Sequence, residues 1–179
     1  MSAEARASEG GSTLNWADMT ASFTPTAAEL RHLRRCVELA TTALEAGDEP
    51  FGSVLVAADG TVLAEDHNRV ASGDRTRHPE FELARWAAAN LTPEERAAAT
   101  VFTSGEHCPM CAGAMVHARL ARVVYGAADP LAGSAGTVFN LLDAAALNHR
   151  ADVQGGVLAE ECSRRLKTFF QSRRGRTGA

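Results

Sequence analysis

The sequence of 179 residues lacks any apolar run of the roughly 18 residues that a helix needs to cross a membrane. Its first residues, MSAEARASEGGS, contain no basic segment followed by an apolar stretch, so they do not resemble a secretory signal peptide. Hydrophobic residues make up 45% and charged residues 22%, which excludes a chain that is disordered or collagen-like as a whole. We therefore predict one cytoplasmic globular domain with no membrane partner.

Cysteine is too scarce for a disulfide-stabilised miniprotein, because only four are present. In a cytoplasmic protein, cysteines are more often thiols or metal ligands than bridges. Cys108 and Cys111 are spaced C-x-x-C, whereas Cys36 and Cys162 stand alone. We expect Cys36 and Cys162 to pack as small buried apolar residues. Cys108 and Cys111 are therefore the candidates for metal binding or thiol chemistry.

Acidic residues are absent after Glu161, although the net charge of the whole chain is −4. Six basic residues follow, namely Arg164, Arg165, Lys167, Arg173, Arg174 and Arg176. The acidic balance of the whole chain argues against a general nucleic-acid binder, but the basic end could contact phosphate groups. Arg173 and Arg174 are therefore candidate RNA contacts. The alternative is a solvated helix face with a frayed end.

Hydrophobic spacing and turn residues predict how the chain is organised. Residues 1–21 are expected to form a disordered leader, 22–174 a single domain, and 175–179 a basic tail. Helices are predicted from the Thr26 capping box to Ala46 and over Pro79–Asn90, Pro109–Leu120, Phe139–Ala146 and Leu158–Arg173. Strands are predicted over Gly52–Ala58, Thr61–Asp66, Thr100–Thr103, Arg122–Tyr125 and Asp152–Val153, with a loop over Gly126–Gly136.

The order of these elements predicts an α/β fold. Asp59-Gly60 favours a tight turn between the first two strands, which makes them an antiparallel hairpin. The later strand–helix–strand unit predicts parallel strands joined by a right-handed crossover. Helices are needed on both faces of such a sheet. We therefore predict a three-layer α/β/α sandwich around a mixed sheet of about five strands.

A metal-ligand pattern is the strongest chemical signal in the chain. His78 precedes Cys108-Pro109-Met110-Cys111 by 30 positions. One imidazole and two thiolates provide three of the four tetrahedral positions of zinc, which is typical of a catalytic site with one open position. No further C-x-x-C or H-x₃-H pair is present to complete a structural site. We predict one catalytic Zn²⁺ per chain.

The prolines after His78 and Cys108 indicate where the ligands lie. Pro79 and Pro109 each suit the first position of a helix, so His78 and Cys108 are expected at N-caps, where helix dipoles favour thiolate. Glu80 is close to this site without being needed as a ligand. A free carboxylate beside a zinc-activated water can carry protons. Its simpler alternative role is to complement the helix N-terminus.

At H-x-E and C-x-x-C, the chain resembles the cytidine deaminase superfamily of zinc deaminases. In its second half, CPMCAGAMVHARLARVVYGAADPLAGSAG, LNHR, GVLAEEC and FFQSRR resemble the bacterial tRNA adenosine deaminases. In its first half, Pro50-Phe51-Gly52 is nearer to the guanine deaminases. The resemblance implies a cytidine deaminase-like fold and a homodimer, with the helix after C-x-x-C near the interface.

The resemblance also implies roles for individual residues. His78, Cys108 and Cys111 match the zinc ligands, Glu80 matches the proton carrier, and Asn68 matches a substrate-binding asparagine. His107 stands in place of the family's usual proline. Beyond the resemblance, we expect Phe51 to contact the base and Glu106 to support the cysteine loop. His107 either bonds within the pocket or fills the loop.

These observations predict a zinc-dependent hydrolase that removes the exocyclic amine of a nucleobase or nucleoside and releases ammonia. A purine such as guanine or adenosine is favoured, and cytosine remains open. The loop Gly126–Gly133 carries no basic residue, which favours a small molecule over RNA. One alternative is a tRNA-specific adenosine deaminase that forms inosine. Another is a non-catalytic zinc module, which would require a fourth protein ligand.

Overall fold

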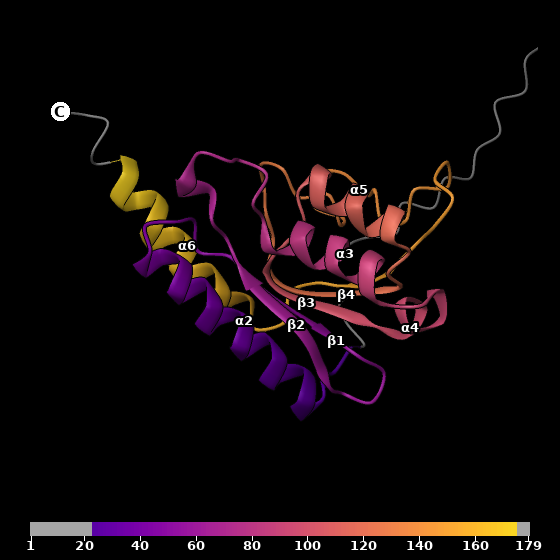
Figure 1. Cartoon of the computed structure of the whole chain (residues 1–179). Coiled ribbons are helices and arrows are strands. Elements are labelled where there is room, and N and C mark those ends of the chain that lie inside the picture. Colours follow the sequence, from indigo (N-terminus) through magenta and orange to yellow (C-terminus); the bar gives the residue numbers. More distant parts are fainter. Residues whose placement is uncertain (1–22, 175–179) are drawn as a thin grey trace, which may run out of the picture.

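The computed structural model describes residues 23–174, with side chains as far as Gln171. Its centre is a single mixed sheet in the order β2-β1-β3-β4-β5 (Figure 1). The strands are β1 (Gly52–Val56), β2 (Val62–His67), β3 (Thr100–Gly105), β4 (Arg122–Ala127) and β5 (Asp152–Gln154). β1 is antiparallel to β2 and β3, whereas β3, β4 and β5 are parallel. The predicted α/β class and mixed five-stranded sheet are confirmed.

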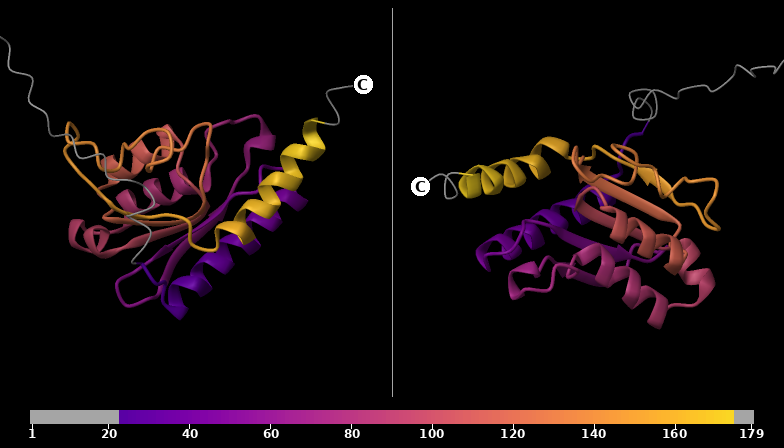
Figure 2. Two further views of the ribbon diagram at one scale, coloured as in Figure 1. Left: turned by 180° about the vertical axis from the view of Figure 1, so that it is seen from behind. Right: turned by 90° about the horizontal axis from the view of Figure 1, so that it is seen from above.

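Helices cover both faces of the sheet, labelled as in Figure 1. α2 (Ala27–Glu45) and α6 (Ala159–Arg174) lie on one face, and α3 (Pro79–Asn90) and α5 (Pro109–Ala118) lie on the other (Figure 2). Two short helices, η1 (Val70–Ser72) and α4 (Pro93–Ala98), connect larger elements. The molecule is therefore the predicted three-layer sandwich.

Strand alternation divides the core into two layers. Leu55 and Val101 pack with the buried side chains of α3 and α5, whereas Val54 and Phe102 pack with those of α2. Because successive side chains of a strand point to opposite faces, odd-numbered positions of β1 and β3 face α3 and α5. The central strands are buried on both faces, as expected for a sheet between two helical layers.

Local sequence explains the ends of several elements. Gly60 has a φ of +88° in the predicted hairpin turn, where Asp59 accepts a hydrogen bond from the Thr61 backbone. Thr26 and Glu29 form the predicted capping box of α2. No element was predicted between Asn90 and Thr100, but α4 forms there, because Thr92 and Glu95 form a second capping box. The same sequence signal was present there and was missed.

The predicted helix Phe139–Ala146 is wrong, because this segment contains turns and an isolated β-bridge from Asn140 to Ala135 but no helix. Its backbone is bound to the preceding loop instead: the Phe139 N–H donates to Gly133 and the Leu141 N–H to Ser134. The predicted loop Gly126–Gly136 also begins too early, since β4 continues to Ala127 through pairing with Gly105. Tertiary hydrogen bonds, which a local hydrophobic pattern does not report, decide the structure here.

Three predictions concern parts of the chain beyond the described residues: the disordered leader 1–21, the basic tail 175–179, and the side chains of Arg173 and Arg174. Within residues 23–174, no helix combines the length and apolar character needed to span a membrane.

Candidate active site

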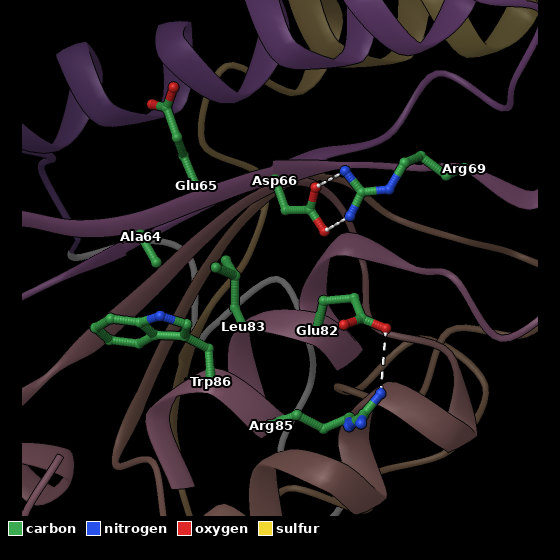
Figure 3. A pocket seen from close by; sticks show the side chains of 8 residues that line it. All are labelled: Ala64, Glu65, Asp66, Arg69, Glu82, Leu83, Arg85 and Trp86. Atoms are coloured by element: carbon green, nitrogen blue, oxygen red, sulfur yellow. Dashed lines mark hydrogen bonds and ion pairs between the residues drawn. The ribbon is translucent and has the colours of Figure 1, made fainter. Parts of the chain in front are cut away.

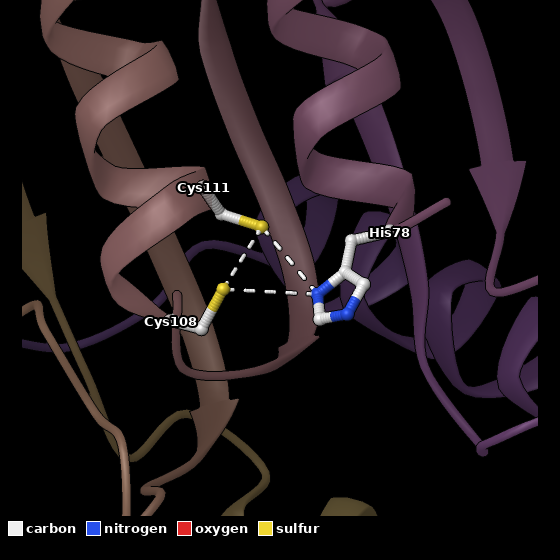
Figure 4. A group of neighbouring side chains, drawn as sticks. All are labelled: His78, Cys108 and Cys111. Atoms are coloured by element: carbon white, nitrogen blue, oxygen red, sulfur yellow. Dashed lines mark hydrogen bonds between the residues drawn. The ribbon is translucent and has the colours of Figure 1, made fainter. Parts of the chain in front are cut away.

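Three predicted ligands converge between the starts of α3 and α5 (Figure 4). The Nδ1 atom of His78 lies 3.7 Å from the Cys108 Sγ atom and 3.6 Å from the Cys111 Sγ atom. The two sulfur atoms are 3.4 Å apart. The three atoms therefore form a compact triangle, although their residues lie in two separate helical segments.

The size of this triangle fits a tetrahedral metal site. Ligand bonds of about 2.3 Å to sulfur and about 2.0 Å to nitrogen place two sulfur ligands roughly 3.8 Å apart. The same bonds place a nitrogen and a sulfur ligand roughly 3.5 Å apart. The separations in the protein approach both values without any rearrangement of the backbone. This His/Cys/Cys donor set suits zinc and leaves a fourth position open.

The helix starts place the ligands as predicted. His78 is the N-cap of α3 and Cys108 is the N-cap of α5, each in extended conformation and each followed by proline at the first helical position. Cys111 lies one turn further into α5. Two helix N-termini therefore direct their positive ends toward the same point, which favours negative charge there.

The site also separates the protonation states of its thiols. The hydrogen bond between the two sulfur atoms, reinforced by His78, lowers the pKa of the Cys108 thiol to about 4. Contact with Cys108 and burial raise the pKa of the Cys111 thiol. The hydrogen bond between the His78 ring and Cys108 raises the pKa of that ring. One thiolate is therefore already present at neutral pH to receive a metal ion.

Glu80 lies beside the triangle, at the second position of α3, and is only 4% exposed. Its Oε2 atom is 3.8 Å from the Cys111 Sγ atom. Its Oε1 atom accepts a hydrogen bond of 2.6 Å from the Thr103 hydroxyl of β3. The carboxylate is thus close enough to act on a molecule bound at the triangle, and one of its oxygens is already engaged.

Asn68 and Phe51 lie on segments flanking β2 and β1. Asn68 is fully buried and uses its Oδ1 atom to accept a hydrogen bond from the Val70 backbone. Its Nδ2 atom has no partner among the described residues. The Phe51 ring is half-buried against Gly105, where an added Cβ atom would lie 2.7 Å from the ring. A buried amide donor therefore lies directly after β2, and an aromatic face lies directly before β1.

Glu106 and His107 form the turn between β3 and Cys108. The buried Glu106 carboxylate accepts three backbone hydrogen bonds, from Asp129, Ala135 and Thr137. It therefore organises the loop after β4, and that loop returns a hydrogen bond to the His107 carbonyl from Ser134. The His107 ring is fully buried and has no hydrogen-bond partner among the described residues. Burial lowers its pKa and keeps it neutral.

Comparison with known proteins assigns the chain to a family. The family model described as MafB19-like deaminase matches residues 28–174. The chain belongs to this deaminase family.

Relatives of this deaminase include tRNA-specific adenosine deaminases from two bacteria. The Haemophilus influenzae protein is 40% identical, over 79% of this chain and 83% of that protein. The Bacillus subtilis protein is 39% identical, over 80% of this chain and 89% of that protein. The predicted enzyme class is confirmed: this MafB19-like deaminase is a hydrolase that acts on C–N bonds.

Solved structures agree with this assignment. One comes from a study of tRNA:A34 deaminases and A-to-I editing at the wobble position. It matches the deaminase with a TM-score of 0.68 and 30% identity, over 76% of this chain and 99% of that chain. A guanine deaminase from Nitrosomonas europaea matches with a TM-score of 0.64. At 20% identity, over 86% of this chain and 90% of that chain, the latter shows the fold alone. The predicted membership of the cytidine deaminase superfamily is confirmed.

A separate groove of the deaminase lies between β2 and α3 (Figure 3). Its charged side chains are paired: Arg69 with Asp66 at 2.7 Å, Arg85 with Glu82 at 3.5 Å, and Glu65 with Arg35 of α2. None of the three converging ligands lines it. The groove is therefore not the candidate active site.

Sequence reasoning missed Thr103 and Ser53, which lie beneath Glu80 in the deaminase. The Ser53 hydroxyl donates a hydrogen bond of 2.9 Å to the Thr103 hydroxyl. Both side chains are fully buried on the central strands. A signal was available, since a serine and a threonine lie two positions from Leu55 and Val101, on the same face of their strands.

Proposed function

We propose that this deaminase hydrolyses the exocyclic amine of an adenosine in tRNA, forming inosine and releasing ammonia. The observation that carries this proposal is the extended similarity to the tRNA-specific adenosine deaminases, combined with the His78, Cys108 and Cys111 triangle beside Glu80. The sequence alone favoured a small molecule, with tRNA as the alternative substrate. The similarity to the tRNA enzymes reverses that preference.

The three ligands of the triangle would hold a zinc ion. When bound, zinc supplies a Lewis acid that lowers the pKa of a coordinated water molecule to about 7. The geometry of His78, Cys108 and Cys111 supports this assignment, because the separations of the donor atoms approach those of a tetrahedral site. The chain's other residues then have to hold the nucleobase of the substrate, and a proton carrier, beside these three side chains.

Glu80 carries the protons in this proposal. Its Oε2 atom accepts one proton from the attacking water and passes it to the ring nitrogen. It then accepts the second proton, from the hydroxyl group of the resulting adduct, and passes it to the departing amine. The oxygen of the water becomes the carbonyl oxygen of the product, and the amine nitrogen leaves as ammonia. The contact between Oε2 and Cys111 supports this role, because it places the carboxylate beside the ligand triangle.

Asn68 and Phe51 would hold the base. The buried Nδ2 atom of Asn68 is a donor without a partner among the described residues, and a substrate acceptor would satisfy it. The half-buried ring of Phe51 offers an apolar face for the purine. We assign His107 to filling the turn before Cys108, since its ring is fully buried and neutral.

A free purine base or nucleoside is the second candidate substrate. The segment Gly126–Gly133, which begins with the last two residues of β4, carries Asp129 and no basic residue. Its Leu131 side chain is 87% exposed, so it presents an apolar surface rather than a positive one. RNA affinity depends strongly on contacts between cations and phosphates, so this loop favours a smaller ligand.

One assay separates these substrates. Zinc-loaded protein is incubated with tRNA transcripts that carry adenosine at the first anticodon position, and inosine is measured after digestion to nucleosides. Parallel reactions contain free adenine, guanine, cytosine and their nucleosides, with ammonia release as the readout. Inosine in tRNA supports the proposal. Turnover of free compounds alone replaces it with the second candidate, and no turnover with one equivalent of zinc contradicts both.

A further inference from the structure

Three buried polar side chains form a continuous chain from the sheet to the candidate active site. Ser53 lies on β1, Thr103 lies opposite it on β3, and Glu80 reaches toward them from α3. Their relative exposures are 0%, 0% and 4%. Ser53 donates to Thr103 at 2.9 Å, and Thr103 donates to Glu80 at 2.6 Å. The carboxylate is therefore anchored in the sheet as well as in its helix.

The two hydroxyl groups occupy positions where the fold uses apolar side chains. Leu55 and Val101 are on the same face of the same two strands, and both pack into the core beneath α3 and α5. A buried hydroxyl group destabilises a core unless it is hydrogen-bonded. Thr103 and Ser53 satisfy this requirement through each other and through Glu80. The hydroxyl groups of Ser53 and Thr103 therefore serve to hydrogen-bond the Glu80 carboxylate and do not serve to fill the core.

The direction of these hydrogen bonds is fixed by the single proton on each hydroxyl group. Ser53 supplies the proton that Thr103 accepts, so the proton of Thr103 is available for another partner. The Gly52 carbonyl lies 3.5 Å from the Thr103 Oγ1 atom, whereas Glu80 Oε1 lies 2.6 Å away. The shorter bond to a carboxylate is the stronger one. Thr103 therefore acts as a donor to Glu80.

This arrangement makes the two oxygens of Glu80 unequal. Oε1 is held by Thr103 on the sheet side, and Oε2 faces the Cys111 sulfur on the ligand side. We propose that Thr103, supported by Ser53, is a positioning residue that fixes the Glu80 carboxylate with Oε2 directed at the reacting molecule. The inference deepens the proposed function and rests on it, since it needs Glu80 to carry protons.

The test compares Thr103→Val, which removes the hydroxyl group at nearly constant volume, with Thr103→Ser, which restores it. Thr100→Val is the matched control, because Thr100 lies at the start of the same strand and has no side-chain hydrogen bond among those described. Each zinc-loaded protein is assayed for kcat, KM and metal content on the substrate found above. Glu80→Gln is assayed alongside.

We expect Thr103→Val to lower kcat roughly 10- to 100-fold while KM changes less than about twofold, because misplacement of a proton carrier affects the reaction more than binding. Thr103→Ser should recover kcat to within about threefold of the unchanged protein. The control Thr100→Val should have the same kcat as the unchanged protein. All variants should retain one equivalent of zinc. A purely structural role would lower activity through metal loss or unfolding and would not give this pattern.

A second measurement does not depend on activity. Thr103→Val should lower the Tm of the zinc-loaded protein by about 2–6 °C when Glu80 is present, because the buried carboxylate loses its donor. In a Glu80→Ala protein, the same substitution should leave the Tm unchanged or raise it, because Thr103 has then lost its acceptor. Equal Tm changes in both backgrounds would show that Thr103 does not interact with Glu80.

The outcomes distinguish this inference from the proposed function. If Glu80→Gln keeps full activity, then Glu80 is not the proton carrier, and both proposals fail. If Glu80→Gln is inactive and Thr103→Val keeps its kcat, only the positioning role is overturned. The positioning role is also overturned if Thr103→Ser fails to recover the activity lost in Thr103→Val.

Discussion

The two faces of the sheet are built from different chemistry. The face toward α3 and α5 carries the buried polar groups Ser53, Thr103 and Glu80 together with the ligand triangle. The face toward α2 is filled mainly by apolar side chains, such as Val54 and Phe102. We call the side of the sheet toward α3 and α5 the active layer and the side toward α2 the supporting layer. Both layers are buried, so burial alone does not distinguish them.

The two layers are held together by different interactions. In the active layer, polar atoms are hydrogen-bonded to one another and converge on two helix N-termini. In the supporting layer, backbone and side chains approach so closely that Gly52 has no room for a side chain beside α2. Substitutions should therefore abolish the reaction in one layer and lower stability in the other.

The largest contrast is expected between two cysteines. Cys108→Ala removes one of three ligands and should eliminate both zinc binding and turnover. Cys162→Ala, in α6 against β4, should keep zinc and activity and lower the free energy of unfolding by about 1 kcal/mol through lost packing. Elemental analysis and denaturant unfolding measure the two effects. Loss of zinc in Cys162→Ala would contradict the division between the layers.

A glycine pair tests the packing of the supporting layer. A Cβ atom on Gly52 would lie 2.5 Å from the Cys36 carbonyl oxygen and 2.5 Å from the Leu39 Cβ atom. Gly52→Ala should therefore reduce the free energy of unfolding by about 1–3 kcal/mol. Gly113→Ala in α5 meets nothing within 4 Å and should raise it by about 0.5–1 kcal/mol, as alanine favours helices. Equal effects in urea unfolding would rule out the close approach of β1 to α2.

The smallest expected effect concerns the start of α2. The Glu29 Oε1 atom lies 2.8 Å from the Arg122 Nη2 atom of β4. Although burial opposes ionisation, hydrogen bonds from the Thr26 backbone and Arg122 lower the pKa of the Glu29 carboxyl group below 4.5. Glu29→Gln keeps an acceptor for the capping box but removes the charge. It should reduce the free energy of unfolding at pH 7 by up to about 1 kcal/mol.

The sign of this pH effect follows from the lowered pKa. The folded protein holds Glu29 ionised more strongly than the unfolded chain does, so the ion pair stabilises the fold above pH 4.5. The stabilisation is lost as the pH falls through the folded-state pKa. Unfolding curves of the unchanged protein and Glu29→Gln should therefore converge in acid. A difference that persists at low pH would assign the effect to capping instead of charge.

Local signals in the sequence predicted the three converging side chains and most elements. His78, Cys108 and Cys111 were found because proline, helix start and ligand spacing lie within a few residues of one another. The predicted metal-site geometry required only that two helices begin at the same place. By contrast, the Thr103–Glu80 bond joins residues 23 positions apart, and Ser53 lies 50 positions from Thr103. Such pairs depend on strand register, which one sequence does not specify.

The wrong helix Phe139–Ala146 has a related cause. The segment was predicted as a short helix; in the structure Leu142 is buried while Phe139 is 54% exposed. Hydrogen bonds to the loop that Glu106 organises hold this segment instead. Glu106 itself was expected to support the cysteine loop, and it does so through the loop after β4. The partners of a buried carboxylate were not predictable from local spacing.

The most direct test of proton transfer by Glu80 is the turnover of Glu80→Gln with its zinc content measured on the same sample. The substitution preserves the size of the side chain and a hydrogen-bond acceptor for Thr103, but it cannot carry the proton. We predict one equivalent of zinc and a loss of kcat of roughly 10²-fold or more. Full zinc content with unchanged kcat would contradict the assignment of proton transfer to Glu80.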